Sequence, residues 1–109
     1  MAKRDMKKLA YEIADLLDSY ECADGTMIYF DNKRLEHLGD EWVLKEGYSP
    51  DTYFEYCNLD TLSMSFEGPF YEVINYGLCN SLLEKFDKLI ASYGYYYELG
   101  NSWNLSLYE

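Results

Sequence analysis

The chain carries its clearest structural signal at Thr61-Leu62-Ser63-Met64-Ser65-Phe66-Glu67, where apolar and polar residues alternate without a break. Successive side chains of a strand point to opposite faces, so Leu62, Met64 and Phe66 share one face. The alternation predicts a strand with one buried face and one polar face. Gly68-Pro69 follows directly, which ends the strand and predicts the start of a helix.

Helical spacing of apolar residues dominates the segment that follows. Within residues 70–90 they recur at intervals of three and four, which predicts a helix of about twenty residues. Gly77 marks a kink or a close-packing point, Asn80-Ser81 offers a restart, and Gly94 ends the helix. Residues 4–21 show the same spacing and predict a second main helix. Its apolar stripe consists of Met6, Leu9, Ile13, Leu16, Leu17 and Tyr20.

The middle of the chain predicts strands and turns with less regularity. Residues 26–30 are β-branched and aromatic enough for a strand, and residues 31–34 predict a turn. Residues 35–44 are ambiguous, although Trp42-Val43-Leu44 could pair as a strand. Ser49-Pro50-Asp51 has the residue types of a helix start and predicts a short helix to about residue 57, with an extended strand as the alternative.

The C-terminus predicts a β-hairpin, in which residues 95–99 and 103–108 flank Gly100-Asn101-Ser102. Together the segments predict an α+β fold, in which an antiparallel sheet of about four to five strands packs with two main helices. A chain of 109 residues is expected to form one domain, residues 1–109. No apolar run approaches the roughly 18 residues of a membrane span, and no signal-peptide pattern follows the basic N-terminus. We therefore expect a cytoplasmic protein whose three cysteines remain thiols.

Charge is the strongest indication of partner class. The chain has 20 acidic and 9 basic residues, and its formal net charge is −11. No basic residue lies between Lys45 and Lys85, a stretch that holds seven acidic residues and five tyrosines. A surface this negative repels phosphate and anionic lipid and attracts cationic clefts over a Debye length of about 8–10 Å. We expect a basic protein partner and no direct binding of nucleic acid or membrane.

No catalytic or cofactor motif stands out in the sequence. His37 is the only histidine and lacks an accompanying cysteine cluster or nucleophile motif, so neither a zinc site nor a Ser-His-Asp triad is expected, and we predict a surface or hairpin residue. Asp24-Gly25 resembles the middle of a calcium loop, but two primary oxygen ligands are missing around it. We predict no cofactor, no metal and no enzymatic activity. The enzymatic alternative is a pair of carboxylates that converge in a cleft.

Tyrosine is unusually frequent, with 13 residues, and we expect several of them on the surface because a core of this size cannot bury them all. Seven of the eleven glutamates directly follow an aromatic residue. On a strand, such a pair places the ring inward and the carboxylate outward. At an interface, the same pair offers rigid contact area beside a carboxylate that binds Arg or Lys.

The segment from Glu46 to Glu84 lacks bases, the acids Glu12, Asp15, Asp18 and Glu21 recur along the first helix, and the α+β pattern is rich in aromatics. In size and balance this composition resembles the small acidic anti-CRISPR and anti-restriction proteins of phages and mobile elements. The resemblance lies in composition, and no family motif is matched residue by residue. It implies an inhibitor that occupies the cationic DNA channel of a nuclease.

We therefore expect a protein-binding inhibitor that mimics DNA and blocks a basic nucleic-acid-handling enzyme, for example a CRISPR effector nuclease or a restriction enzyme. Carboxylates three or four residues apart on a helix rise by about 4.5–6 Å, and a duplex strand carries one phosphate per about 3.4 Å. The alternative is an immunity- or antitoxin-like interaction protein that binds a basic partner without mimicking nucleic acid. Charge contacts are expected at Asp15, Asp18, Asp51, Glu55, Asp60, Glu67 and Glu72.

Overall fold

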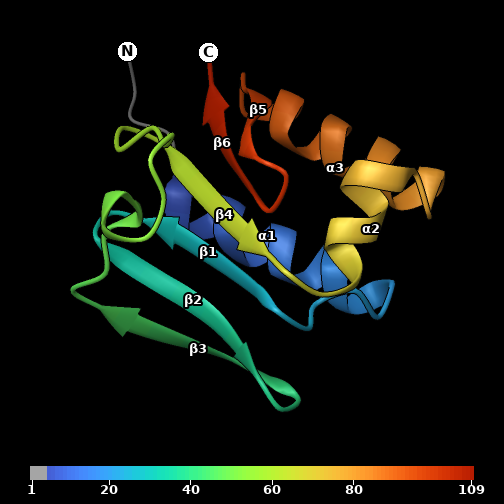
Figure 1. Cartoon of the computed structure of the whole chain (residues 1–109), viewed down its shortest axis with the longest axis horizontal. Helices are drawn as coiled ribbons and strands as arrows, with labels where there is room; N and C mark the ends of the chain where they lie inside the picture. Colours follow the sequence, from blue (N-terminus) through green and yellow to red (C-terminus); the bar gives the residue numbers. More distant parts are fainter. Residues whose placement is uncertain (1–4) are drawn as a thin grey trace.

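The computed structural model describes residues 5–109, which form a six-stranded antiparallel sheet with three α-helices on one of its faces (Figure 1). The strand order is β3-β2-β1-β4-β6-β5, so β3 and β5 are the edges of the sheet. Within residues 5–109, no helix has the length and apolar character needed to cross a membrane. The elements are α1 (Met6–Ser19), β1 (Thr26–Phe30), β2 (Lys33–Leu38), β3 (Glu41–Glu46), η1 (Pro50–Thr52), β4 (Leu62–Phe66), α2 (Pro69–Tyr76), α3 (Asn80–Ser92), β5 (Tyr96–Asn101) and β6 (Asn104–Tyr108).

The hydrophobic core lies between the helices and the sheet. Ile28, Met64 and Leu105 stand side by side on β1, β4 and β6 and are fully buried. The apolar stripe of α1 and the buried residues of α2 and α3 pack against this face. The α+β fold and the C-terminal hairpin are thus confirmed, while the sheet has more strands and the helical layer one more helix than expected.

The helix predicted over residues 70–90 is two helices. α2 ends at Tyr76 because Gly77 adopts a left-handed conformation with φ +64°, which an α-helix cannot continue. α3 then begins at Asn80, which confirms the restart signal. The short helix predicted from Ser49 is wrong in extent, since the structure has only the single 3-10 turn Pro50–Thr52 there.

The ambiguous residues 35–44 belong to a hairpin of β2 and β3, joined by the two-residue turn Gly39-Asp40. The φ of Gly39 is +63° and that of Asp40 is not positive, which fits the type II′ turn that matches the twist of paired strands. The turn between β1 and β2 is also two residues long, Asp31-Asn32. The predicted turn over residues 31–34 is therefore shorter, and residues 33 and 34 begin β2.

On β4 the outer face of the sheet, opposite the helices, is largely covered as well: it carries polar residues as expected, but Ser63 is buried and Ser65 is half-buried, so the expectation of a single buried face is wrong. Residues 47–61 cross this face and place the Tyr53 and Phe54 rings 5.8 and 5.6 Å from the ring of Tyr29. Ser63 is only 1% exposed, and its hydroxyl bonds to that of Ser106 at 2.7 Å. The two buried hydroxyl groups thus satisfy each other's hydrogen-bonding capacity without water.

Two basic residues, Arg34 and Lys45, form ion pairs on the same outer face. Glu36 is buried and forms ion pairs with Arg34 and with Lys45, whose Nζ lies 3.1 Å from Glu36 Oε2. The Arg34 guanidinium also lies 3.8 Å from the centroid of the Tyr48 ring, a cation–π contact. The Arg34 side chain is thereby mostly buried, at 12% exposed, while that of Lys45 remains 37% exposed.

Two glycines allow the chain to cross itself where β1 begins and β4 ends. The Glu67 N–H donates a hydrogen bond to the Gly25 carbonyl oxygen at 3.1 Å. A Cβ atom on Gly68 would collide with the backbone carbonyl of Asp24, so no side chain fits at that position. The crossing holds residues 24 and 25 against residues 67 and 68, and it sets the positions of the Asp24 and Glu67 side chains.

We expect Gly68→Ala to lower the free energy of unfolding by about 3 kcal/mol, because the methyl group meets rigid backbone. Gly39→Ala is the matched control: nothing lies within 4 Å of its Cβ position, and only the positive φ opposes the substitution. That control should cost about 1 kcal/mol. Urea unfolding followed by circular dichroism measures both. Equal losses for the two variants would show that the crossing is not tightly packed.

Tyrosine hydroxyls hold α1 against α3. The Tyr93 hydroxyl donates to Glu12 Oε1 at 2.7 Å, and the Tyr20 hydroxyl bonds to that of Ser81 at 2.7 Å. Burial, together with the hydrogen bond to the Glu12 carboxylate, raises the pKa of Tyr93 to about 12. The protonated form of Tyr93 is therefore favoured in the folded protein.

This raised pKa predicts a loss of stability at alkaline pH. Tyrosine ionises near pH 10 in an unfolded chain, so the contribution of Tyr93 is complete below about pH 10 and falls as the pH rises toward 12. Tyr93→Phe should flatten the pH dependence of the urea midpoint between about pH 10 and 12. Tyr76→Phe, at a ring that is 72% exposed, should leave that dependence unchanged. Identical alkaline profiles for both variants would contradict the assignment.

Candidate functional site

The seven acids predicted to contact a partner are all exposed. Asp15 and Asp18 lie one turn apart on α1. Three others lie in the connection between β3 and β4, and the last two flank the junction of β4 and α2. The members of these two groups are Asp51, Glu55 and Asp60, and Glu67 and Glu72.

The structure does not gather these seven acids into one cluster. Asp60 precedes β4 and Glu67 follows it, so the five-residue strand separates them by about 16 Å along its axis. Two of the seven line hollows with other charged residues: Glu67 lies in one with Arg34, and Asp18 lies in one with three further carboxylates.

This acidic hollow lies where α1 gives way to β1 and faces the turn between β2 and β3. Its volume is about 390 Å³. The residues that line it are Asp18, Glu21, Ala23, Asp24, His37, Gly39 and Asp40. Four carboxylates and one imidazole thus meet from two stretches of the chain, residues 18–24 and 37–40.

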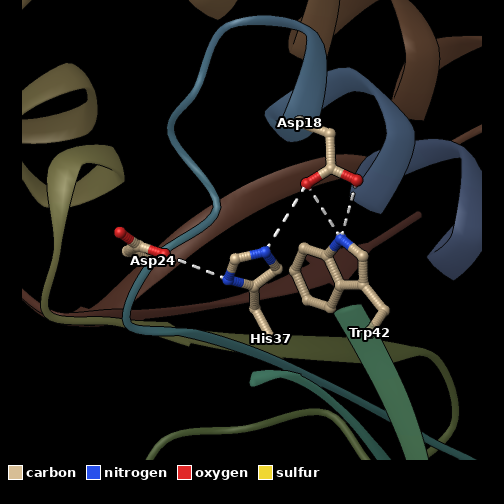
Figure 2. A network of polar contacts seen from close by, with 4 residues as sticks. All are labelled: Asp18, Asp24, His37 and Trp42. Carbon is tan, nitrogen blue, oxygen red and sulfur yellow. Dashed lines mark hydrogen bonds and ion pairs between the residues drawn. The ribbon is translucent and has the colours of Figure 1, made fainter. Parts of the chain in front are cut away.

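His37 stands at the centre of the polar contacts in the hollow (Figure 2). Its Nδ1 lies 3.1 Å from Asp24 Oδ1, and its Nε2 lies 3.9 Å from Asp18 Oδ1. The Trp42 indole N–H donates to both oxygens of Asp18, at 3.1 and 3.0 Å. The His37 side chain is only 10% exposed and packs edge-on against the Trp42 ring, with centroids 5.1 Å apart.

The arrangement favours binding of a cation over nucleophilic chemistry. Both nitrogens of His37 face carboxylates, and no serine, threonine or cysteine lines the hollow. Asp24 is 80% exposed and Asp18 is 46% exposed, so both can accept further hydrogen bonds from outside. In residues 5–109 no group of three or more histidines, cysteines or acids is placed to hold a metal ion.

A second hollow bears on the enzymatic alternative. Burial raises the pKa of Asp87, which lies beside Ile90 and the run Tyr95-Tyr96-Tyr97 around a volume of about 190 Å³. Acid–base catalysis of the expected kind needs two carboxylates with separated pKa values. Asp87 is the only carboxylate that lines this hollow.

Sequence reasoning missed most of the acidic hollow. Glu21, Asp24 and Asp40 were not predicted as partner contacts, and His37 was predicted to be a surface or hairpin residue. His37 does lie in a hairpin, but its side chain is mostly buried. The feature that identifies the hollow is the cross-strand pairing of His37 with Trp42. The sequence does not reveal this pairing, because it depends on the register of β2 and β3.

The surface charge is distributed unevenly over the fold. All acidic residues are exposed except Glu36, which is buried, and Glu12, which is half-buried. The exposed basic residues within residues 5–109 lie only on α1 and α3, at Lys7, Lys8, Lys85 and Lys88. The sheet edges, the turns and the connection over the outer face therefore expose mainly carboxylates, with the partly exposed Lys45 on β3 paired to Glu36.

Comparison of the chain with protein-family models, with curated proteins and with solved structures finds no significant match.

We expect Asp18→Asn to move the Trp42 indole N–H resonance and to lower the free energy of unfolding by about 1 kcal/mol, because a charged acceptor is lost. The chain has two tryptophans, so the resonance of Trp103 serves as an internal reference. Asp15→Asn, one turn earlier on α1, should leave both indole resonances in place. An unchanged Trp42 resonance in Asp18→Asn would show that this bond does not form in solution.

Proposed function

We propose that the protein is an acidic inhibitor that binds a basic nucleic-acid-handling enzyme and presents carboxylates where that enzyme would hold DNA phosphates. A CRISPR effector nuclease or a restriction enzyme is the kind of target that this chemistry fits. The protein acts by occupying the target's cationic channel, without catalysis and without a cofactor.

The distribution of exposed charge carries this proposal. Outside α1 and α3, the fully exposed charges of the described residues are all carboxylates, while Lys33, Arg34 and Lys45 are only partly exposed, so a cationic channel meets attraction over most approaches. Arg34 and Lys45 also pair with Glu36, and the Arg34 side chain is 12% exposed.

The spacing of the acids supports phosphate mimicry on a local scale. Asp15 and Asp18 are both exposed and rise by about 4.5 Å along α1, close to the spacing of successive phosphates. Asp51, Glu55 and Asp60 extend the negative surface over the outer face of the sheet.

One observation favours the alternative of an immunity- or antitoxin-like protein. The acidic hollow is compact and combines Asp18 and Asp24 with His37 and Trp42, which suits the capture of single Arg or Lys side chains more than a row of phosphate contacts. Such a protein would bind a basic partner that need not handle nucleic acid.

The test is a pull-down from host lysate with the tagged protein at low and high salt, with and without added duplex DNA. Mimicry predicts that a DNA- or RNA-binding enzyme is recovered at low salt and that DNA displaces it. Recovery that depends on salt but not on DNA supports the alternative. Recovery of a nuclease that responds to neither condition would rule out phosphate mimicry.

With the partner identified, we expect the double variant Asp51→Asn, Glu55→Gln to weaken binding about fivefold at low salt, since an exposed pair contributes up to about 1 kcal/mol. The control is Glu84→Gln with Asp87→Asn on α3, where exposed lysines already offset the charge. Titration calorimetry at two salt concentrations measures both. Equal effects of the two variants would mean that net charge alone, and not this surface, determines binding.

A further inference from the structure

The free edge of β3 is the most regular unpaired backbone in the described part of the chain. β3 pairs with β2 through all six of its residues and has no bulge and no proline. It forms the outermost strand on its side of the sheet, with no element beyond it in Figure 1. The opposite edge, β5, is interrupted by a register shift between Leu99 and Asn101, and such irregularities discourage pairing.

The register of the hairpin identifies which backbone groups point outward. The two-residue turn makes Leu38 and Glu41 the first hydrogen-bonded pair, and hydrogen-bonded pairs alternate with non-bonded pairs from there. The N–H and C=O groups of Trp42, Leu44 and Glu46 therefore point away from β2. No backbone hydrogen bond from turns or loops in residues 5–109 reaches these groups.

Acidic side chains surround this edge on the helical side. The two hydrogen bonds from Trp42 hold Asp18, and with it one side of α1, above β3. Asp15 lies one turn earlier on the same side of α1 and is also exposed. Of the exposed acids at the ends of the strand, Glu46 shares the helical face with Trp42, and Glu41 lies on the outer face.

A second copy of this chain does not fit the edge. In a symmetric antiparallel register that uses the outward groups, Leu44 of the two copies would stand opposite each other and Trp42 opposite Glu46, so no acid of one copy would meet a base of the other. Each copy also carries a formal charge of −11.

We propose that β3 is the docking edge for an extended, cationic segment of the partner, which adds a seventh antiparallel or parallel strand to the sheet. Main-chain hydrogen bonds to Trp42, Leu44 and Glu46 supply the pairing, and lysine or arginine side chains of the added strand face Asp15 and Asp18. The inference rests on the proposed function in one respect, the basic character of the partner.

The test uses a synthetic peptide of alternating lysine and threonine, eight residues long, with amide exchange followed by NMR on the intact protein. We expect exchange at the outward amides of Trp42, Leu44 and Glu46 to slow several-fold, while that of the inward amides of Val43 and Lys45 stays the same. A peptide of the same sequence, N-methylated at alternate residues, keeps the charge but cannot pair and should give no protection. Glu41→Gln with Glu46→Gln should weaken binding of the lysine peptide about fivefold at low salt, and Glu98→Gln on β5 should not.

Failure of this inference differs from failure of the proposed function. Equal binding of both peptides without protection would overturn the docking edge and leave the acidic surface as the binding element. No binding of either peptide would overturn the docking edge and count against a basic partner as well. Protection that rises with protein concentration in the absence of peptide would assign the edge to a second copy, against the inference.

Discussion

The central strands β1, β4 and β6 are largely buried on both faces, and the helices can cover only one of them. The outer face is closed by residues 47–61, an irregular connection whose Tyr53 and Phe54 rings pack on Tyr29. A polar group buried without a partner costs about 1–3 kcal/mol, so the hydroxyls under this cover have to be paired. The Ser63–Ser106 hydrogen bond, and the bond from the Thr61 hydroxyl to the Leu107 carbonyl oxygen, meet that requirement.

The connection formed by residues 47–61 also influences which charges the surface exposes. Arg34 and Lys45 extend from β2 and β3 toward the buried Glu36, and Arg34 stacks on Tyr48 of the connection. Cations are scarce in this chain, so their pairing with Glu36 leaves the sheet edges and turns mainly to the carboxylates. The acidity of the surface thus results from both the composition and the way in which the outer face is closed.

The acidic hollow and the β3 edge meet at Trp42. Its indole N–H holds Asp18 on the helical side, its ring packs on His37, and its backbone lies on the free edge of the sheet. The crossing of residues 24–25 with residues 67–68 brings Asp24 to the other nitrogen of His37. A partner that pairs with β3 would therefore meet carboxylates positioned by α1, by the start of β1 and by the β2–β3 turn.

The sequence by itself determined the α+β class, α1, the strands β1 and β4, the C-terminal hairpin and the excess of acids, because each is encoded in local periodicity or composition. Exposure of several tyrosines, among them Tyr53, Tyr56, Tyr76 and Tyr96, was also predictable from their number. Only the tertiary structure decided the β2–β3 register, the burial of the outer face, and the meeting of Asp18, Asp24 and His37. The burial of the outer face and the meeting of Asp18, Asp24 and His37 depend on contacts between separate elements, which a one-dimensional pattern does not specify. The β2–β3 register is local, but it depends on where the two-residue turn falls, and the pattern of residues 35–44 is ambiguous on that point.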